Sequence, residues 1–124
     1  MLKDAIAHAT LPVADIDRAK GFWAKVGLSP TNESPGGVEY ELAGGSGFSI
    51  YPTRNANRGG HTQLDFRVND IDSEVADLRA KGVTFEDYDF PGLKTENGIA
   101  TTEGGKAAWF KDEDGNIIGV FQRN

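Results

Sequence analysis

The sequence predicts an α+β fold built from two βαβββ modules in a single domain. Two observations predict it: an internal repeat with a constant offset, and the same order of strand-like and helix-like segments in both copies. The copies are "HATLPVADIDRAKGFWAKVGL" from His8 and "QLDFRVNDIDSEVADLRAKGV" from Gln63. Such a repeat divides a chain into equivalent structural units. We expect module one to span residues 1–54, a linker 55–58 and module two 59–124, which together form one domain over 1–124.

Each copy contains a helix whose two ends are marked by characteristic residues. Asp15 and Asp70 are N-cap candidates, because a carboxylate accepts hydrogen bonds from the free N–H groups of a first turn. Gly27 and Gly82 are the expected ends, since glycine readily adopts the left-handed conformation found there. Apolar residues recur between them at helical spacing. They are Ala19, Phe22, Trp23 and Val26 in the first helix, and Ile71, Val75 and Leu78 in the second.

Short strand-like segments follow each helix: "VEYEL" and "GFSIYP" after the first, and "VTFEDY", "AAWF" and "IIGVF" after the second. Between the last two, "KDEDGNIIG" (Lys111 to Gly119) has the alternating acidic residues of a calcium loop. A calcium loop that began at Asp112 would need Gly and Glu where the chain has Ile117 and Arg123. We therefore interpret "DEDGN" as a turn that joins two strands.

A long glycine-rich connection, "DYDFPGLKTENGIATTEGG", joins two strands of module two. Long connections without regular structure are usually lids or mobile loops. We expect Tyr88, Phe90 and Leu93 to fold over the mouth of a cavity, and the alternative is a solvated loop that does not touch a ligand.

Composition restricts the partners of the chain. Its 124 residues are 38% hydrophobic and carry a formal net charge of -6, without a cysteine. The length suffices for a hydrophobic core, whereas disulfides and thiolate metal sites are excluded. No segment has the length and apolar character of a membrane span, and the N-terminus has no signal-peptide pattern. No basic face is visible. We expect a cytoplasmic protein with a small-molecule partner, and neither nucleic acid nor membrane as a partner.

The repeat and the closing "AWFKDEDGNIIGVFQ" together resemble the vicinal oxygen chelate superfamily, which includes glyoxalase I, fosfomycin-resistance proteins, extradiol dioxygenases and bleomycin-resistance proteins. The resemblance covers essentially the whole chain. It implies a curved mixed sheet around a central cavity, with the helices outside. It also places the metal ligands of the family's enzymes at His8, at Gln63, at Gly119 (where the family often has Glu) and, for some members, at Ile50.

These positions do not supply a metal site. A divalent ion takes about three or four ligands from the His, Asp, Glu or Cys repertoire, and one imidazole with one neutral amide is insufficient. We therefore expect neither metal nor cofactor. The alternative is a rearranged site of His8, His61 and Asp65, because His61 and Asp65 lie on the same side of their strand as Gln63.

Alternation along the strands assigns side chains to the cavity or to the helices. The expected cavity has apolar walls and a few polar groups, as small-molecule pockets do. The predicted ligand-binding residues are His8, Thr10, Phe48, Ile50, His61, Gln63, Asp65, Trp109, Gly119 and Phe121, with Ile6, Tyr40 and Ile117 as further wall candidates. For Trp109 and Tyr40 the alternative is ordinary packing in the core.

These features favour a metal-free protein that binds an aromatic or partly apolar molecule, neutral or cationic, in the cavity or at a dimer interface, as the bleomycin-resistance members do. The resemblance also implies a homodimer. Antibiotic resistance, storage, sensing and metabolism all fit such a pocket. One alternative is a metal-dependent lyase, isomerase, transferase or dioxygenase with a rearranged site. Another is a metal-free enzyme with His8 or Asp65 as general base, although no catalytic residue is assigned.

Overall fold

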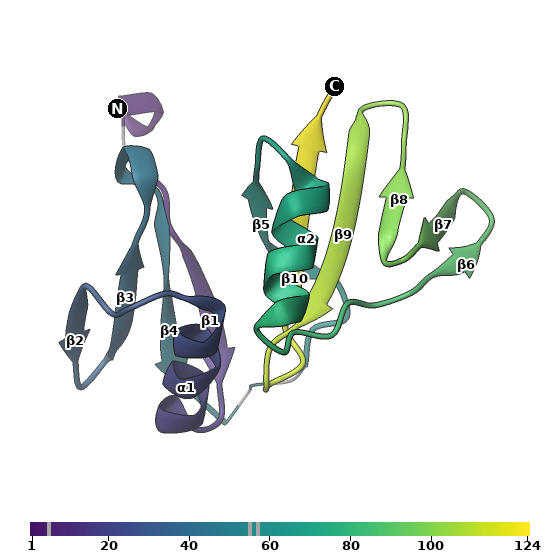
Figure 1. The fold of residues 1–124 in the computed structure, drawn as a ribbon. Coiled ribbons are helices and arrows are strands. Elements are labelled where there is room, and N and C mark those ends of the chain that lie inside the picture. The colour runs from purple at the N-terminus through teal and green to yellow at the C-terminus, as the bar shows by residue number, and fades with distance from the viewer. Residues whose placement is uncertain (5, 55, 57) are drawn as a thin grey trace.

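The computed structural model describes residues 1–4, 6–54, 56 and 58–124. It contains a four-stranded sheet in module one, called sheet one here, and a six-stranded sheet in module two, called sheet two (Figure 1). The elements of module one are η1 (Leu2–Asp4), β1 (Ala9–Val13), α1 (Ile16–Val26), β2 (Asn32–Ser34), β3 (Gly37–Glu41), η2 (Ala43–Gly45) and β4 (Gly47–Pro52). Those of module two are β5 (Thr62–Arg67), α2 (Ile71–Ala80), β6 (Asp89–Phe90), β7 (Leu93–Glu96), β8 (Ile99–Thr101), β9 (Gly105–Lys111) and β10 (Ile117–Arg123).

The helix boundaries follow from the predicted caps. Asp15 accepts hydrogen bonds from the backbone N–H groups of Asp17 and Arg18, and Asp70 accepts one from Ser73. Gly27 ends α1 with a left-handed φ of 104°. In α2 the cap is Lys81, one residue before the expected glycine, and Gly82 follows it. Neither helix, nor any other helix in the described part of the chain, is long and apolar enough to cross a membrane.

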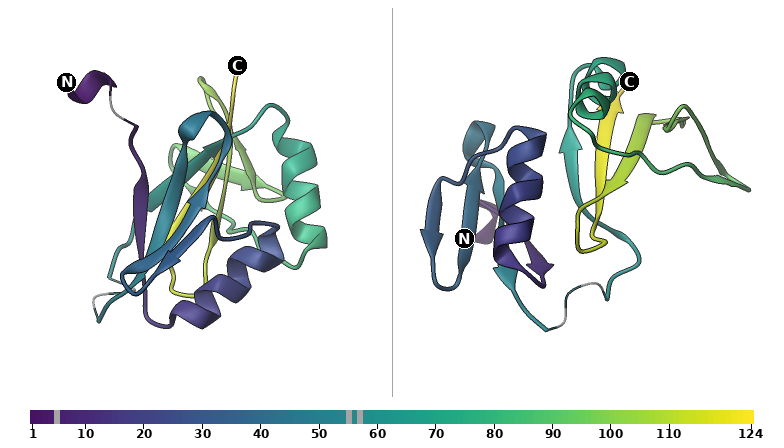
Figure 2. Two further views of the ribbon diagram at one scale, coloured as in Figure 1. Left: turned by 90° about the vertical axis from the view of Figure 1, so that its left-hand side faces the viewer. Right: turned by 60° about the horizontal axis from the view of Figure 1, so that its bottom comes forward.

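The long connection of module two is more ordered than expected. It forms β6, β7 and β8, which extend sheet two in the order β5-β10-β9-β8-β7-β6. The β6–β7 hairpin projects from sheet two on the side away from module one (Figure 2). Conversely, the expected strand "VTFEDY" makes only an isolated bridge between Phe85 and Phe110.

In each module the first and last strands pair in parallel. Leu11 on β1 lies opposite Ile50 on β4, and Phe66 on β5 lies opposite Val120 on β10. Since Leu11 and Phe66 are equivalent in the repeat, Ile50 is the counterpart of Val120. The residue of module one that corresponds to Gly119 is therefore Ser49, and the expectation that Ile50 holds a ligand position of the family is wrong.

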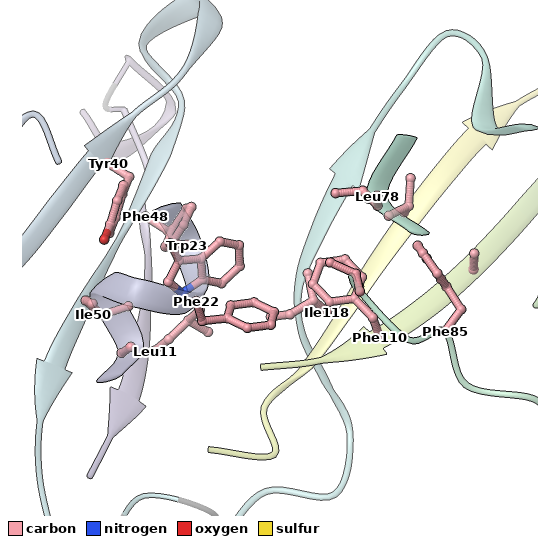
Figure 3. Packing of buried hydrophobic residues seen from close by; sticks show 14 of the residues in the cluster. Leu11, Phe22, Trp23, Tyr40, Phe48, Ile50, Leu78, Phe85, Phe110 and Ile118 are labelled. Carbon is pink, nitrogen blue, oxygen red and sulfur yellow. The ribbon is translucent and has the colours of Figure 1, made fainter. Parts of the chain in front are cut away.

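The α+β class and the two modules are confirmed, and the strands form two separate sheets rather than the one curved sheet expected. Both sheets turn their helix-bearing faces toward each other, so that α1 lies between them (Figure 3). Phe22 on α1 lies 6.2 Å from Phe110 of module two, between ring centroids, and Trp23 lies 6.4 Å from Phe66. Buried residues of both modules form one cluster, to which each helix contributes its apolar side while its polar side remains exposed.

The "DEDGN" turn between β9 and β10 fastens module two onto module one. Asp114 accepts hydrogen bonds from the backbone N–H of Ala14 at 2.7 Å and from Arg18 at 3.2 Å. The side-chain amide of Asn116 donates to the backbone carbonyl of Pro12 at 2.9 Å. Within the turn, the Asp112 carboxylate accepts from the backbone N–H groups of Asp114 and Asn116. Asp114 and Asn116 therefore dock the two modules, whereas Asp112 holds the turn together.

Candidate functional site

The outer face of sheet two, which points away from the core, carries most of the predicted ligand-binding residues of module two. Strand pairing sets Asp65 on β5 opposite Gly119 on β10, and Gly119 opposite Trp109 on β9. Phe121 lies one pair further along β10 on the same face, opposite Ala107. Their neighbours of opposite parity, among them Phe66, Ile118, Phe110 and Val120, pack in the core. The alternation predicted for these strands is thus confirmed.

An aromatic wall forms where the connection after α2 folds back over β9. The ring of Tyr88 lies 5.4 Å from that of Trp109 with 69° between their planes, and 5.9 Å from that of Phe90. Edge-to-face contacts at this distance are favourable. The backbone N–H of Glu86 donates to the carbonyl of Trp109 at 2.8 Å and fixes the connection there. Phe90 remains 53% exposed, so the wall ends in an apolar group that meets solvent.

Gly119 gives space to the carboxylate of Asp65. A Cβ atom at Gly119 would lie 2.5 Å from Oδ1 of Asp65, closer than van der Waals contact allows. The backbone of Gly119 is not left-handed, so space rather than conformation disfavours a side chain at this position. The resemblance to metal enzymes suggested a lost carboxylate at residue 119. The structure instead places a carboxylate from the adjacent strand over this position.

The outer face of sheet one is polar. Thr10, Ser49 and Glu39 form one cross-strand row on β1, β4 and β3, and Tyr51 lies beside them at 38% exposure. A shallow groove of about 520 Å³ follows this face. Glu39 and Glu41 are exposed on the same side of β3 and make this face acidic.

Phe48 and Ile50, predicted for the cavity, lie in the core instead, and Tyr40 lies there as well, in agreement with its alternative of core packing. Phe48 and Ile50 are fully buried, and the ring of Phe48 lies 4.7 Å from that of Trp23. Tyr40 stacks on Phe48 at 5.0 Å. On β4 the outward positions belong to the alternate residues, Ser49 and Tyr51. The sequence contains a signal for this orientation. In "GFSIYP", Phe48 and Ile50 are the more apolar alternate residues, and the more apolar side of a strand packs against the helix that covers the sheet.

The two histidines are exposed and do not converge. Nε2 of His8 lies 3.1 Å from the carbonyl of Gly45, and Nδ1 of His61 lies 3.1 Å from that of Thr62. Within residues 1–4, 6–54, 56 and 58–124, no three His, Cys, Asp or Glu side chains gather as metal ligands. The alternative set of His8, His61 and Asp65 is therefore not brought together as metal ligands in the described part of the chain. The donors at the family positions, His8, Gln63 and Gly119, also do not fit a divalent ion.

The environment of Asp65 has a measurable consequence for stability. Partial burial raises the pKa of its carboxyl above the ordinary value, although Arg67 opposes this rise. A carboxyl group whose pKa is raised by folding destabilises the folded state when it is ionised. This destabilisation is absent below the pKa of the unfolded state and fully present once the pH exceeds the pKa of the folded state. We expect Asp65→Asn to raise the melting temperature slightly at pH 7 and to leave it unchanged near pH 3. Thermal melts at both pH values measure this, and a lower melting temperature at pH 7 would contradict it.

Comparison with known proteins agrees with this architecture. A family model described as "Glyoxalase/Bleomycin resistance protein/Dioxygenase superfamily" matches residues 5–120. An antibiotic binding protein, TnmS3 from Streptomyces sp. CB03234, is 27% identical, with 97% of this chain and 98% of that chain covered and a TM-score of 0.68. A bleomycin-binding protein solved with bleomycin is 17% identical, with 97% and 99% covered and a TM-score of 0.75. FosX, a fosfomycin resistance protein from Listeria monocytogenes, is 15% identical, with 98% and 94% covered and a TM-score of 0.70. No curated protein matches the sequence.

Proposed function

Because the chain belongs to the glyoxalase/bleomycin resistance protein/dioxygenase superfamily, we propose that it is a metal-free protein that binds an aromatic or partly apolar small molecule. The observation that carries this proposal is the aromatic wall of Trp109, Tyr88 and Phe90 on the open outer face of sheet two. Large aromatic surfaces beside a few polar groups are typical of small-molecule sites. The antibiotic-binding neighbours support a sequestering role, of which antibiotic resistance in the cytoplasm is the form we propose.

The proposed site is completed by a second copy of the chain. Each protomer has two outer sheet faces, the polar face of sheet one and the face of sheet two with the aromatic wall. In a two-fold dimer, the polar outer face of sheet one of one protomer would cover the aromatic outer face of sheet two of its partner. Two-fold symmetry then gives two equivalent pockets, each with walls from both chains.

We expect a dimer in sedimentation velocity at micromolar concentrations. Ser49→Arg places a long charged side chain at the centre of the outer face of sheet one and should shift the protein toward monomer. Ser73→Arg introduces the same change at an exposed position of α2 and is the control. A parent protein that sediments as a monomer up to high micromolar concentration would exclude this dimer.

Ligand binding can be followed through the tryptophans. Trp23 is fully buried in the core, whereas Trp109 is partly exposed on the proposed site. A planar aromatic ligand should therefore quench the emission of Trp109 and leave the emission of Trp23 unchanged. In the Trp109→Phe variant this quenching should be absent. Because the proposed site is metal-free, EDTA should not change the titration. A panel of naphthalene derivatives tests this, and binding that EDTA abolishes would contradict the proposal.

A further inference from the structure

An apolar pocket of about 190 Å³ lies at the junction of the two modules, on the helix-bearing side of sheet two. We propose that it is a second binding site, which takes a neutral molecule with a single aromatic ring. The inference is independent of the proposed function, because Phe110 of the pocket and Trp109 of the aromatic wall are neighbours on β9 and point to opposite faces of the sheet. The apolar walls of the pocket include Val26 and Leu28 of module one, and Phe66, Val68, Phe110 and Val120 of module two.

The first step is the apolar surface that the fold leaves incompletely covered at this junction. Two wall residues from each module pack against the core but remain partly exposed: Val26, Leu28, Phe66 and Val68. Phe110 on β9 is only 1% exposed and completes the wall from the core. A ligand in the pocket would cover the remaining apolar surface of both modules at once, which is favourable because apolar area is removed from water.

The second step is the size of the pocket and the kind of side chain that surrounds it. An apolar cavity of about 150 Å³ is enough to hold benzene in a protein interior. The pocket at the module junction is close to this size and therefore has room for one ring rather than two. Phe66 and Phe110 contribute two aromatic rings to its walls, and aromatic pairs gain from edge-to-face or offset contacts that a saturated ring cannot make. Size and lining together favour a single aromatic ring.

The third step is the polarity of the lining. In the part of the chain that the structure describes, no residue with a buried and unpaired polar side-chain atom lines the pocket, so the walls offer nothing to hold a water molecule. The polar residues that line it are Glu74, Asp77 and Lys81, which are exposed on α2 and form its rim, and Lys81 already pairs with Asp77 at 2.9 Å. Two carboxylates and one ammonium group leave the rim with one net negative charge, which disfavours an anion. Any charged group would also have to leave water for apolar walls, so a neutral ligand is favoured.

The test follows the methyl groups of the parent protein by NMR while toluene, methylcyclohexane or benzoate is added. Toluene should shift the methyl signals of Val26, Leu28 and Val68, because its ring current acts only on nearby groups. It should also raise the melting temperature, because the pocket exists only when the modules are docked. We expect the dissociation constant of toluene to be about tenfold lower than that of benzoate. Methylcyclohexane has a similar size without an aromatic ring and should bind more weakly than toluene.

Two variants locate the ligand. Leu28→Phe and Val68→Phe each place a larger side chain in the wall of the pocket and should abolish the shifts that toluene causes. Leu42→Phe is the control, because it adds the same ring at another partly buried position that packs against the core outside this pocket, and it should preserve the shifts. Trp109→Phe should preserve them as well, since Trp109 lies on the other face of sheet two.

The outcomes separate this inference from the proposed function. If toluene shifts no methyl group of the pocket in the parent protein, the second site is wrong. If methylcyclohexane or benzoate binds as tightly as toluene, the ligand class is wrong and the inference also fails. If toluene still binds to a wall variant that circular dichroism shows to be folded, the pocket is not its site. None of these results affects the proposed function, which is measured separately through the quenching of Trp109 by naphthalene derivatives.

Discussion

Replacing Trp23 by Ala is expected to lower the free energy of unfolding by about 3–5 kcal/mol, the range for removing a large buried aromatic side chain. Trp23 is fully buried and contacts both modules: its ring lies 4.7 Å from Phe48 of module one and 6.4 Å from Phe66 of module two. The cavity would therefore open at the junction of the modules, where neither sheet alone can close it. Urea denaturation followed by far-ultraviolet circular dichroism measures the loss.

Phe90→Ala is the control for Trp23→Ala, because Phe90 is an aromatic residue with 53% exposure on the projecting hairpin. It should change the free energy of unfolding by less than about 1 kcal/mol. The parent should also unfold in one transition, since the two modules share one core. Two separated transitions in the parent, or equal losses in the two variants, would contradict the shared core.

Replacing Asp114 by Ala is expected to lower the free energy of unfolding by about 2–3 kcal/mol. The Asp114 side chain is only 2% exposed and accepts bonds from the backbone of Ala14 and from Arg18, and bonds to a charged group contribute more than neutral ones. Arg18 is 48% exposed, so the ion pair alone is partly screened by water and contributes less than the buried bond to Ala14. Chemical denaturation measures the loss.

The same turn provides a matched control. Glu113 precedes Asp114 but is exposed, so Glu113→Ala should change stability by no more than about 0.5 kcal/mol. Combining Asp114→Ala with Arg18→Ala in a double-mutant cycle isolates the ion pair. If Glu113→Ala costs as much as Asp114→Ala, the turn acts only through its local conformation and the docking interpretation fails.

Much of the fold could be predicted because it depends on local signals. Asp15 and Asp70 cap helices through their own side chains, so a sequence window of a few residues suffices to find them. The outward parity of Asp65, Gly119 and Trp109 could be predicted for the same reason, since their strand neighbours are strongly apolar. Superfamily membership followed from the repeat and the "DGN" turn together.

The rest depends on contacts between distant residues. The carboxylate of Asp65 takes the space of a side chain at Gly119 only because β5 and β10 pair in parallel, and neither residue alone indicates this. The role of Asp114 in joining the modules likewise needs Ala14, which is 100 positions away. The errors at Phe48 and Ile50 arose from transferring strand parity from one module to the other without the pairing register.

The aromatic core lies across the junction of two modules, which are linked by one short polar segment. We therefore expect that the chain can be divided at this segment into two fragments that reassemble. Residues 1–54 and 59–124, expressed as separate fragments, would each expose the apolar face that the other normally covers. Neither fragment should be stable alone, whereas the two together should reassemble through Trp23, Phe48 and Phe66 without a peptide bond between them. A ligand that binds the reassembled pair would then make association of the fragments depend on its concentration, which turns the chain into a small-molecule sensor.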